Sequence, residues 1–508
     1  MSPQLWKDQF ILEFGRMRLR GGRGFIQRRD GREVRPLPSR AKSSSNSPED
    51  NIDWKWMFRI SCNWRRGRCS IESINDAQYL RNSSLPSSVL LTGSLLITSL
   101  PTLSASPLVY LHRTSGLPIT MSGSHRTKTP THITTLTLDQ SPPSSLHLTR
   151  LACFYDTGEF SIFSIDHTNP ESSRRLISYL PQLRTDRTAP IQHAAYHHPL
   201  LATLSEGFDL SLYDMSDDNI VHTQTLSSFT SFPPSSLVLS APTARKDRDN
   251  YYKLVLAYAV PVFPAHWSVA VTELKISSGS RTDSNSSTSS PPPCTVLSTR
   301  STRAYDFPPG WVDESALRDV KAQWGRKVAR VADTQTDGKW VVLAPADRLP
   351  SPAGSGVLGT TSSALQLYRL HLPPAPSGSS SSGSRMASAT TSPRLTFVRF
   401  LHGHTGPVIA LSLADGRCVS LGADGSIWAW DLEKGWSAEV QAPRHSVGSL
   451  SGSQPRESSG SSTDDDDSTV DDEESSVLPK ALIGSVVFDE RRIVSTTAHG
   501  IELRNFDV

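Results

Sequence analysis

The 508-residue sequence predicts an all-β protein in which seven small antiparallel sheets stack into a closed ring, a β-propeller. Two features of the sequence support this fold class. Apolar segments of strand length recur along most of the chain, and turn pairs such as Asp-Gly and Glu-Gly separate them. A sheet of a few short strands cannot bury both of its faces alone, so a chain that contains many such sheets must stack them on one another.

Residues 402–431 form the clearest of the repeated units. Three short apolar segments follow one another there. The pair Asp415-Gly416 separates the first two segments, and residues 422–425 separate the second from the third. This pattern predicts a meander of three antiparallel strands.

The same unit carries a motif at its two ends. It begins with Gly403-His404 and ends, about two dozen residues later, with Trp430-Asp431. This order and spacing resemble the WD-repeat signature. The resemblance implies that His404 and the turn residue Asp424 join a hydrogen-bond network that stabilises the blade. The blade-signature residues are then His404, Asp424, Trp430 and Asp431.

Six weaker copies of this unit complete the predicted set of seven. They lie at residues 89–113, 151–166, 191–214, 253–276, 327–345 with 364–370, and 483–507. The stretches read as irregular or of low complexity are residues 114–130, 167–188, 276–294, 300–326, 373–394 and 438–479. Without them, the chain from residue 66 onward divides into seven units of the ~40–45 residues typical of a blade. We therefore expect a seven-bladed propeller over residues 66–508, with disordered inserts near 276–294, 373–394 and 445–476.

The two ends of the predicted ring complement each other. The last unit stops after its third strand, which leaves the final sheet without an outer strand. Residues 68–74 stand just before the first blade, and we expect them to supply that strand. Closing the ring in this way would remove the open sheet edges through which β proteins aggregate.

The segment before the propeller is dense in aromatic and basic residues. Its motif consists of Trp54, Lys55, Trp56, Phe58, Arg59, Asn63, Trp64, Gly67 and Cys69. This motif resembles the linker that precedes the propeller in fungal F-box/WD-repeat proteins. The resemblance covers only this short segment and implies a helical linker over residues 52–65.

Residues 1–15 resemble the closing helix of an F-box. The apolar residues that recur there at helical spacing are Leu5, Trp6, Phe10 and Phe14. Any other short amphipathic helix would show the same spacing. No earlier F-box helix is found before Leu5, so a Skp-type adaptor and a cullin are expected as partners only if an F-box precedes this sequence.

Residues 16–51 are expected to form a basic disordered linker, since residues 16–40 contain nine arginines. An RGG-type run within it could bind RNA, but a solvated linker or a nuclear-import signal is the commoner explanation. The formal net charge of +3 is too small to indicate a nucleic-acid partner, so none is expected.

No catalytic signature is found in the sequence. It contains no P-loop, dinucleotide-binding, zinc-protease or nucleophile-elbow motif, so we expect no enzyme activity, no cofactor and no metal site. The five cysteines include no CxxC pair, which suits a reducing compartment. No signal peptide or membrane-spanning segment is apparent, and the expected location is cytoplasmic, nuclear or both.

These features predict a protein-interaction platform. The resemblance implies a substrate receptor of an SCF-type ubiquitin ligase that binds target proteins through loops of the propeller. A candidate partner-binding loop, residues 301–325, joins two blades and contains Tyr305, Phe307, Trp311 and Trp324. These aromatic residues could equally pack the loop onto the propeller. The alternative function is a WD-repeat scaffold unconnected with ubiquitin, working in an RNA-linked complex.

Overall fold

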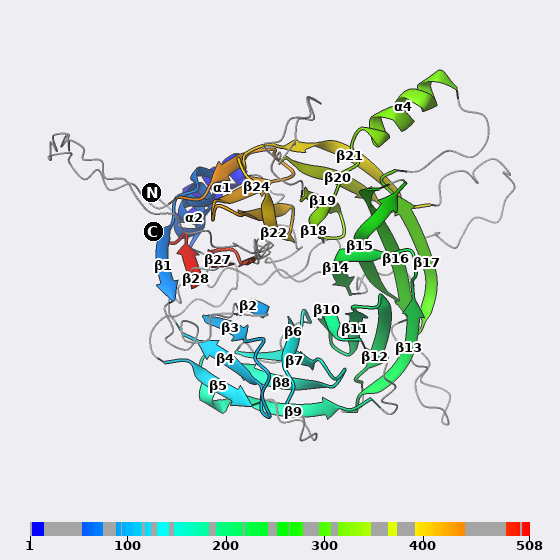
Figure 1. Ribbon diagram of the computed structural model, residues 1–508. Coiled ribbons are helices and arrows are strands. Elements are labelled where there is room, and N and C mark those ends of the chain that lie inside the picture. The colour runs from blue at the N-terminus through cyan, green and yellow to red at the C-terminus, as the bar shows by residue number, and fades with distance from the viewer. Residues whose placement is uncertain are drawn as a thin grey trace, which may run out of the picture.

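The computed structural model shows seven four-stranded antiparallel sheets arranged around a central axis, as Figure 1 shows. The structure describes residues 3–14, 53–74, 88–92, 94–113, 117–122, 130–141, 147–181, 189–216, 219–241, 251–263, 265–277, 294–305, 313–346, 364–372, 392–441, 484–497 and 500–508. The prediction of a seven-bladed propeller is therefore confirmed.

Six blades use four strands that are consecutive in the chain, with the first strand nearest the ring axis. Blade 1 consists of β2 (Ser88–Thr92), β3 (Leu95–Ser99), β4 (Leu108–His112) and β5 (Ile119–Ser122). Blade 2 consists of β6 (Ile133–Leu138), β7 (Leu148–Tyr155), β8 (Phe160–Asp166) and β9 (Arg174–Tyr179). Blade 3 consists of β10 (Ile191–His197), β11 (Leu200–Ser205), β12 (Asp209–Asp214) and β13 (Val221–Ser227).

The next three blades repeat this order. Blade 4 consists of β14 (Phe232–Ser240), β15 (Tyr251–Val262), β16 (His266–Ser277) and β17 (Val296–Arg303). Blade 5 consists of β18 (Val331–Thr336), β19 (Trp340–Pro345), β20 (Leu365–His371) and β21 (Arg394–Leu401). Blade 6 consists of β22 (Val408–Ala414), β23 (Arg417–Gly422), β24 (Ile427–Asp431) and β25 (Ser437–Glu439).

Blade 7 joins the two ends of the propeller. Its strands are β26 (Ser485–Phe488), β27 (Arg492–Thr497), β28 (Gly500–Asn505) and, as the outer strand, β1 (Ser70–Ile74). β1 runs antiparallel to β28, with Ser70 opposite Asn505 and Ile74 opposite Ile501. The expected closing strand is therefore confirmed, because the strand that precedes blade 1 in the sequence completes blade 7 in space.

The core lies between the blades. Seven clusters of buried apolar side chains occur in the described residues, and each cluster fills one interface between neighbouring blades. Between blades 3 and 4, for example, Leu204 of β11 packs in the same cluster as Leu254 of β15. Each sheet thus buries its two faces against its neighbours, as the lengths of the strands require.

Several stretches read as irregular from the sequence contain regular structure. Residues 114–130 include β5, and residues 167–188 include β9 and a 3₁₀ helix at Pro170–Ser172. Both strands are the outer strands of their blades. Their side chains are mostly exposed or half-buried, so their sequences lack the apolar pattern by which an inner strand is recognised.

The stretch at 300–326 was also read wrongly, because it contains helix α4 (Glu314–Trp324). The side chain of Asp313 accepts a hydrogen bond from the backbone N–H of Ala316 and caps this helix. α4 projects at the perimeter of the ring (Figure 1).

Two of the three expected disordered inserts, 276–294 and 373–394, overlap described structure at their ends. Ile276 and Ser277 belong to β16, buried Cys294 precedes β17, and Arg394 begins β21. Residues 278–293, 373–391 and 442–483 lie outside the described residues, and with them the remainder of the three expected inserts. The expected basic linker, residues 16–51, lies entirely outside the described residues.

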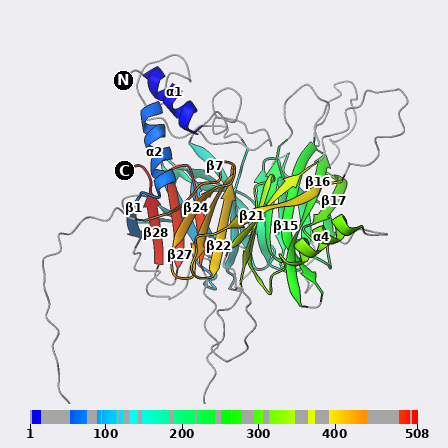
Figure 2. The same cartoon turned by 90° about the horizontal axis from the view of Figure 1, so that it is seen from above.

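Two further helices, α1 (Pro3–Phe14) and α2 (Trp54–Arg66), stand on one face of the ring at blades 6 and 7 (Figure 2). The C-terminal end of α2 leads into the start of β1. In each blade, the turn between the third and fourth strands lies at this end of the strands, because consecutive strands alternate in direction. The connections between blades lie at the other end, and we call that end the inter-blade face.

Candidate functional site

Helix α2 has its own start and stop signals. The side chain of Asp53 accepts a hydrogen bond from the backbone N–H of Trp56 at 3.0 Å, which caps the first turn. Gly67 ends the helix in the left-handed conformation, with φ of 65°. A Cβ atom at Gly67 would lie 1.9 Å from the carbonyl oxygen of Glu439 in β25, so only glycine fits this position.

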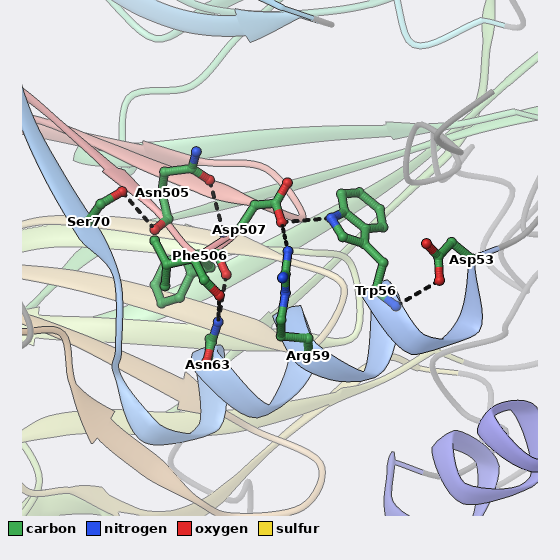
Figure 3. Close-up of polar contacts among 9 residues, drawn as sticks. Asp53, Trp56, Arg59, Asn63, Ser70, Asn505, Phe506 and Asp507 are labelled. Carbon is green, nitrogen blue, oxygen red and sulfur yellow. Dashed lines mark hydrogen bonds and ion pairs between the residues drawn. The ribbon is translucent and has the colours of Figure 1, made fainter. Parts of the chain in front are cut away.

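One face of α2 is held by the C-terminal residues of the chain (Figure 3). The indole N–H of Trp56 donates to a carboxylate oxygen of Asp507 at 2.7 Å, and Arg59 pairs with the same oxygen. One turn further on, the side-chain amide of Asn63 donates to the carbonyl oxygen of Phe506 at 2.9 Å. These contacts tie the linker motif to the end of blade 7.

Trp64 anchors the same helix in the apolar core between blades 6 and 7. Its side chain is fully buried and stacks on Phe506, with ring centroids 3.9 Å apart and planes 10° apart. Its indole N–H donates to the carbonyl oxygen of Glu490 at 2.9 Å. The guanidinium of Arg417, which belongs to β23 of blade 6, lies 4.1 Å from the centroid of the Trp64 ring.

Helix α1 packs on α2 through aromatic side chains. Phe10 and Phe14 are buried, and their rings lie 5.8 Å from that of Trp54 and 5.5 Å from that of Phe58, respectively. Trp6 is half-buried against Phe58. Leu5, the fourth residue expected on this face, is 48% exposed instead.

Polar contacts fix the end of α1 to the propeller. The ammonium of Lys434, in the turn between β24 and β25, donates to the carbonyl oxygen of Glu13 at 2.7 Å and lies 5.6 Å from the centroid of Phe14. The carboxylate of Glu13 pairs with Arg65 of α2. α1, α2 and blades 6 and 7 therefore form one packed unit.

Three of these contact residues, Asp507, Lys434 and Arg417, could not be predicted from the sequence. Asp507 stands where a blade repeat would end, and nothing local marks it as an acceptor for residues about 450 positions earlier. Lys434 and Arg417 are ordinary basic residues of a turn and a strand. Their roles depend on which helix lies over blade 6.

The blade-signature residues lie in blade 6. Trp430 donates its indole N–H to the Ser420 hydroxyl at 2.9 Å, and that hydroxyl lies 2.7 Å from Nε2 of His404. On the other side of the ring, Nδ1 of His404 lies 3.1 Å from the hydroxyl of Ser426, which donates to Asp424 at 2.6 Å. His404 and Asp424 therefore belong to one chain of hydrogen bonds, joined through Ser426.

The fourth signature residue, Asp431, lies outside this chain of hydrogen bonds. Asp431 is buried, and its carboxylate accepts the backbone N–H groups of Glu433 and Lys434 at 3.1 and 2.8 Å. It shapes the turn that presents Lys434 to α1. Burial lowers the pKa of His404 to about 4, so its imidazole is neutral at neutral pH.

Comparison with known families places this propeller. A family model described as F-box protein pof12 beta-propeller matches residues 112–317, from the end of β4 into α4. The match covers less than half of the chain and, together with the seven-bladed fold, it supports a propeller of the fungal F-box-protein type. A propeller of this type is a platform for protein interaction.

Two other comparisons add little. A search of curated proteins gave no match. A computationally designed protein, Ika8, is 9% identical, and the alignment covers 84% of this chain and 96% of that chain with a TM-score of 0.33. That score is too low to support any argument.

The expected partner-binding loop is only partly described. Phe307 and Trp311 lie outside the described residues. Tyr305 follows β17, Trp324 ends α4, and their rings lie 5.6 Å apart. Trp324 also faces His266 of β16, with ring centroids 6.5 Å apart, so the C-terminal end of α4 lies against blade 4.

The described part of the propeller offers no metal centre. Within the described ranges, no group of three or more His, Cys, Asp or Glu side chains is arranged to hold a metal ion. All five cysteines have free thiols, and none of the described helices is long and apolar enough to cross a membrane.

Proposed function

We propose that this chain is the substrate receptor of an SCF-type ubiquitin ligase, acting in the cytoplasm, the nucleus or both. The propeller binds the target protein, and the α1 side carries the Skp-type adaptor and, through it, the cullin. The protein itself performs no chemistry. Ubiquitin transfer belongs to the partner subunits, and the target is directed to degradation.

The observation that carries this proposal is the attachment of α1 and α2 to blades 6 and 7. A receptor must hold its target at a fixed position relative to the ligase. α2 is bonded to the C-terminal residues through Trp56, Arg59 and Asn63, and α1 is bonded to the propeller through Lys434. A helix held at so many points works as a rigid spacer rather than a flexible tether.

The exposed side of α1 offers a place for further helices. Leu5 is 48% exposed and Leu12 is 81% exposed, while the opposite side of α1 packs on α2. Apolar side chains of this size in a packed helix favour contact with another protein surface. We expect the adaptor-binding part of an F-box to pack there.

Affinity purification tests the proposal. The protein is expressed from its own chromosomal locus, so that any residues encoded ahead of Met1 are kept, and its partners are identified by mass spectrometry. We expect a Skp-type adaptor and a cullin to be recovered. The double substitution Leu5→Asp and Leu12→Asp should remove both, whereas Leu117→Asp, which alters an exposed leucine of blade 1, should not.

The outcome also separates the proposal from its alternative. Recovery of ribonucleoprotein components without adaptor or cullin would favour the scaffold unconnected with ubiquitin and would reject the receptor.

A further inference from the structure

Two phenylalanines are exposed on the inter-blade face at blade 4. Phe229 is 92% exposed and Phe263 is 87% exposed, the two highest values for aromatic side chains in the described residues. Phe229 lies in the connection from β13 to β14, and Phe263 lies in the turn between β15 and β16. Both segments are on the inter-blade face, opposite α1 and α2. Exposed aromatic side chains gathered in one place mark interaction surfaces.

Further aromatic side chains lie on the same face of the propeller, in contact with one another or with neighbouring residues. Phe232 packs edge-to-face on Trp267, with ring centroids 5.5 Å apart. The backbone of Trp267 exchanges two hydrogen bonds with that of Val328, which connects blade 4 to the segment after α4. That segment brings Trp324 to His266 and Tyr305. We call this surface the aromatic corner: Phe229, Phe232, Phe263, Trp267, Tyr305 and Trp324.

Three basic residues of the described part of the chain lie on the same face as the aromatic corner. Arg303 ends β17, Lys327 lies with its ammonium 4.1 Å from the centroid of Trp324, and Arg330 precedes β18. The described residues within 228–232, 261–268, 303–305 and 324–330 include no aspartate or glutamate. A partner segment that carries acidic residues is therefore complementary to this surface.

We propose that the aromatic corner binds a peptide segment of a partner protein that has at least one large apolar side chain next to acidic residues. The apolar side chain packs among the exposed phenylalanines, and the acidic residues face Arg303, Lys327 and Arg330. Interfaces commonly combine aromatic anchors with arginine in this way. The site deepens the proposed receptor function and rests on it, since it names the kind of target segment that the propeller takes.

A second copy of this chain is a poorer occupant. In a two-fold symmetric contact through this corner, the same patch meets itself, so Arg303, Lys327 and Arg330 would face their own copies. Like charges brought together across an interface cost free energy. An acidic segment of another protein meets no such penalty.

The experiment uses the purified full chain and a phage-displayed library of random twelve-residue peptides. We expect the enriched peptides to share a Phe, Trp or Leu next to Asp or Glu. The most enriched peptide is then synthesised with a fluorophore, and its binding is measured by fluorescence polarisation. The double substitution Phe229→Ser and Phe263→Ser should weaken it about tenfold or more. Raising the sodium chloride from about 50 to about 500 mM should weaken it as well.

Matched variants separate the two parts of the surface. Leu117→Ser changes a side chain that is 89% exposed at the opposite end of the strands, and it should leave the affinity unchanged. Arg303→Glu should weaken the acidic peptide and leave a peptide with Asn and Gln in place of Asp and Glu unaffected. Equal binding by the double-serine variant would overturn the proposal, as would the absence of any enriched peptide.

One result would assign the surface to a second copy instead. It is concentration-dependent dimerisation in analytical ultracentrifugation that the double-serine variant abolishes. These binding measurements need no adaptor. Peptide binding can therefore be absent although the affinity purification recovers adaptor and cullin, and it can be present although the purification recovers neither.

Discussion

His404 shows how one buried side chain makes the stability of a blade depend on pH. Its ring is 8% exposed and links Ser420 to Ser426, and burial lowers its pKa to about 4. In the unfolded chain the pKa returns to its ordinary value of about 6.5. Between these two values the unfolded state binds a proton that the folded state does not. The contribution to the free energy of unfolding is therefore present above about pH 6.5 and is lost as the pH falls towards 4.

The substitution His404→Asn tests this sign. At pH 7 we expect it to lower the free energy of unfolding by about 1–3 kcal/mol, because hydrogen bonds to both serines are lost or weakened. At about pH 5 the difference in the free energy of unfolding between the two proteins should be smaller by about 2 kcal/mol. Only the natural protein has this histidine, and protonating it in the unfolded state lowers the free energy of unfolding. Urea unfolding at both pH values measures it.

The control for His404 is His222→Asn, at an exposed histidine of β13. Because this side chain is exposed, its substitution should lower the free energy of unfolding at pH 7 by much less than His404→Asn does. Groups present in both proteins cancel in this comparison, including Asp333, whose pKa burial raises to about 6. A pH-independent difference for His404→Asn would contradict the prediction.

Gly67 is the residue on which the junction between α2 and β1 depends. Alanine there would need φ of 65° and would place its Cβ 1.9 Å from the carbonyl oxygen of Glu439. We expect Gly67→Ala to lower the free energy of unfolding by at least about 2 kcal/mol, as strain and the displacement of β25 add together. Gly406→Ala is the matched control, because nothing lies within 4 Å of a Cβ at that position. A similar loss for both substitutions, measured by urea unfolding, would contradict this.

Helix α2 is the element that joins the two ends of the chain to each other. Trp64→Ala would remove a fully buried ring that stacks on Phe506, and it should cost about 3–5 kcal/mol in the free energy of unfolding. Trp6→Ala removes the same kind of side chain from α1. Trp6 is only half-buried, and its ring packs on that of Phe58 in α2.

The comparison tests whether α2 belongs to the propeller core. We expect the loss for Trp6→Ala to be clearly smaller, with limited proteolysis releasing α1 but leaving the ring uncut. If Trp64→Ala and Trp6→Ala lower the free energy of unfolding by the same amount, α2 is no more a part of the propeller core than α1 is.

At the scale of the whole molecule, the ring is closed by one strand. β1 pairs with β28 over five residue pairs, and it is the outer strand of blade 7. Deleting residues 1–75 removes β1, α1 and α2, and it opens the ring at blade 7. The lost backbone hydrogen bonds are worth about 1 kcal/mol each, against a typical domain stability of about 5–15 kcal/mol. The exposed edge of β28 would also favour aggregation.

Deleting only residues 1–50 is the matched truncation. It removes α1 but keeps α2 and β1, so the ring should stay closed, with a modest loss from uncovering Trp54 and Phe58. Thermal melting and light scattering of the two truncated proteins measure the difference. Equal melting temperatures would show that β1 does not close this propeller.

The sequence alone determined those features that have local signals. The number of blades follows from inner strands that are apolar and end in turn pairs, as at Asp415-Gly416. The position of the closing strand follows from a last repeat that is one strand short. The helical linker followed from a resemblance over a short motif, and the structure adds the physical reason for two of its residues. Trp64 fills the core between blades 6 and 7. Gly67 has no Cβ atom, which would otherwise clash with the carbonyl oxygen of Glu439.

The tertiary structure decided the rest. The outer strands β5 and β9 are strands because a third strand offers them hydrogen-bonding groups, and their own polar sequences do not show it. The choice of Asp507 as the partner of Trp56 and Arg59 depends on ring closure, which brings together residues about 450 positions apart. The aromatic corner likewise combines Phe232, Trp267 and Trp324 from three separate segments, which come together only through the pairing of strands in blade 4 and the position of the end of α4 against that blade.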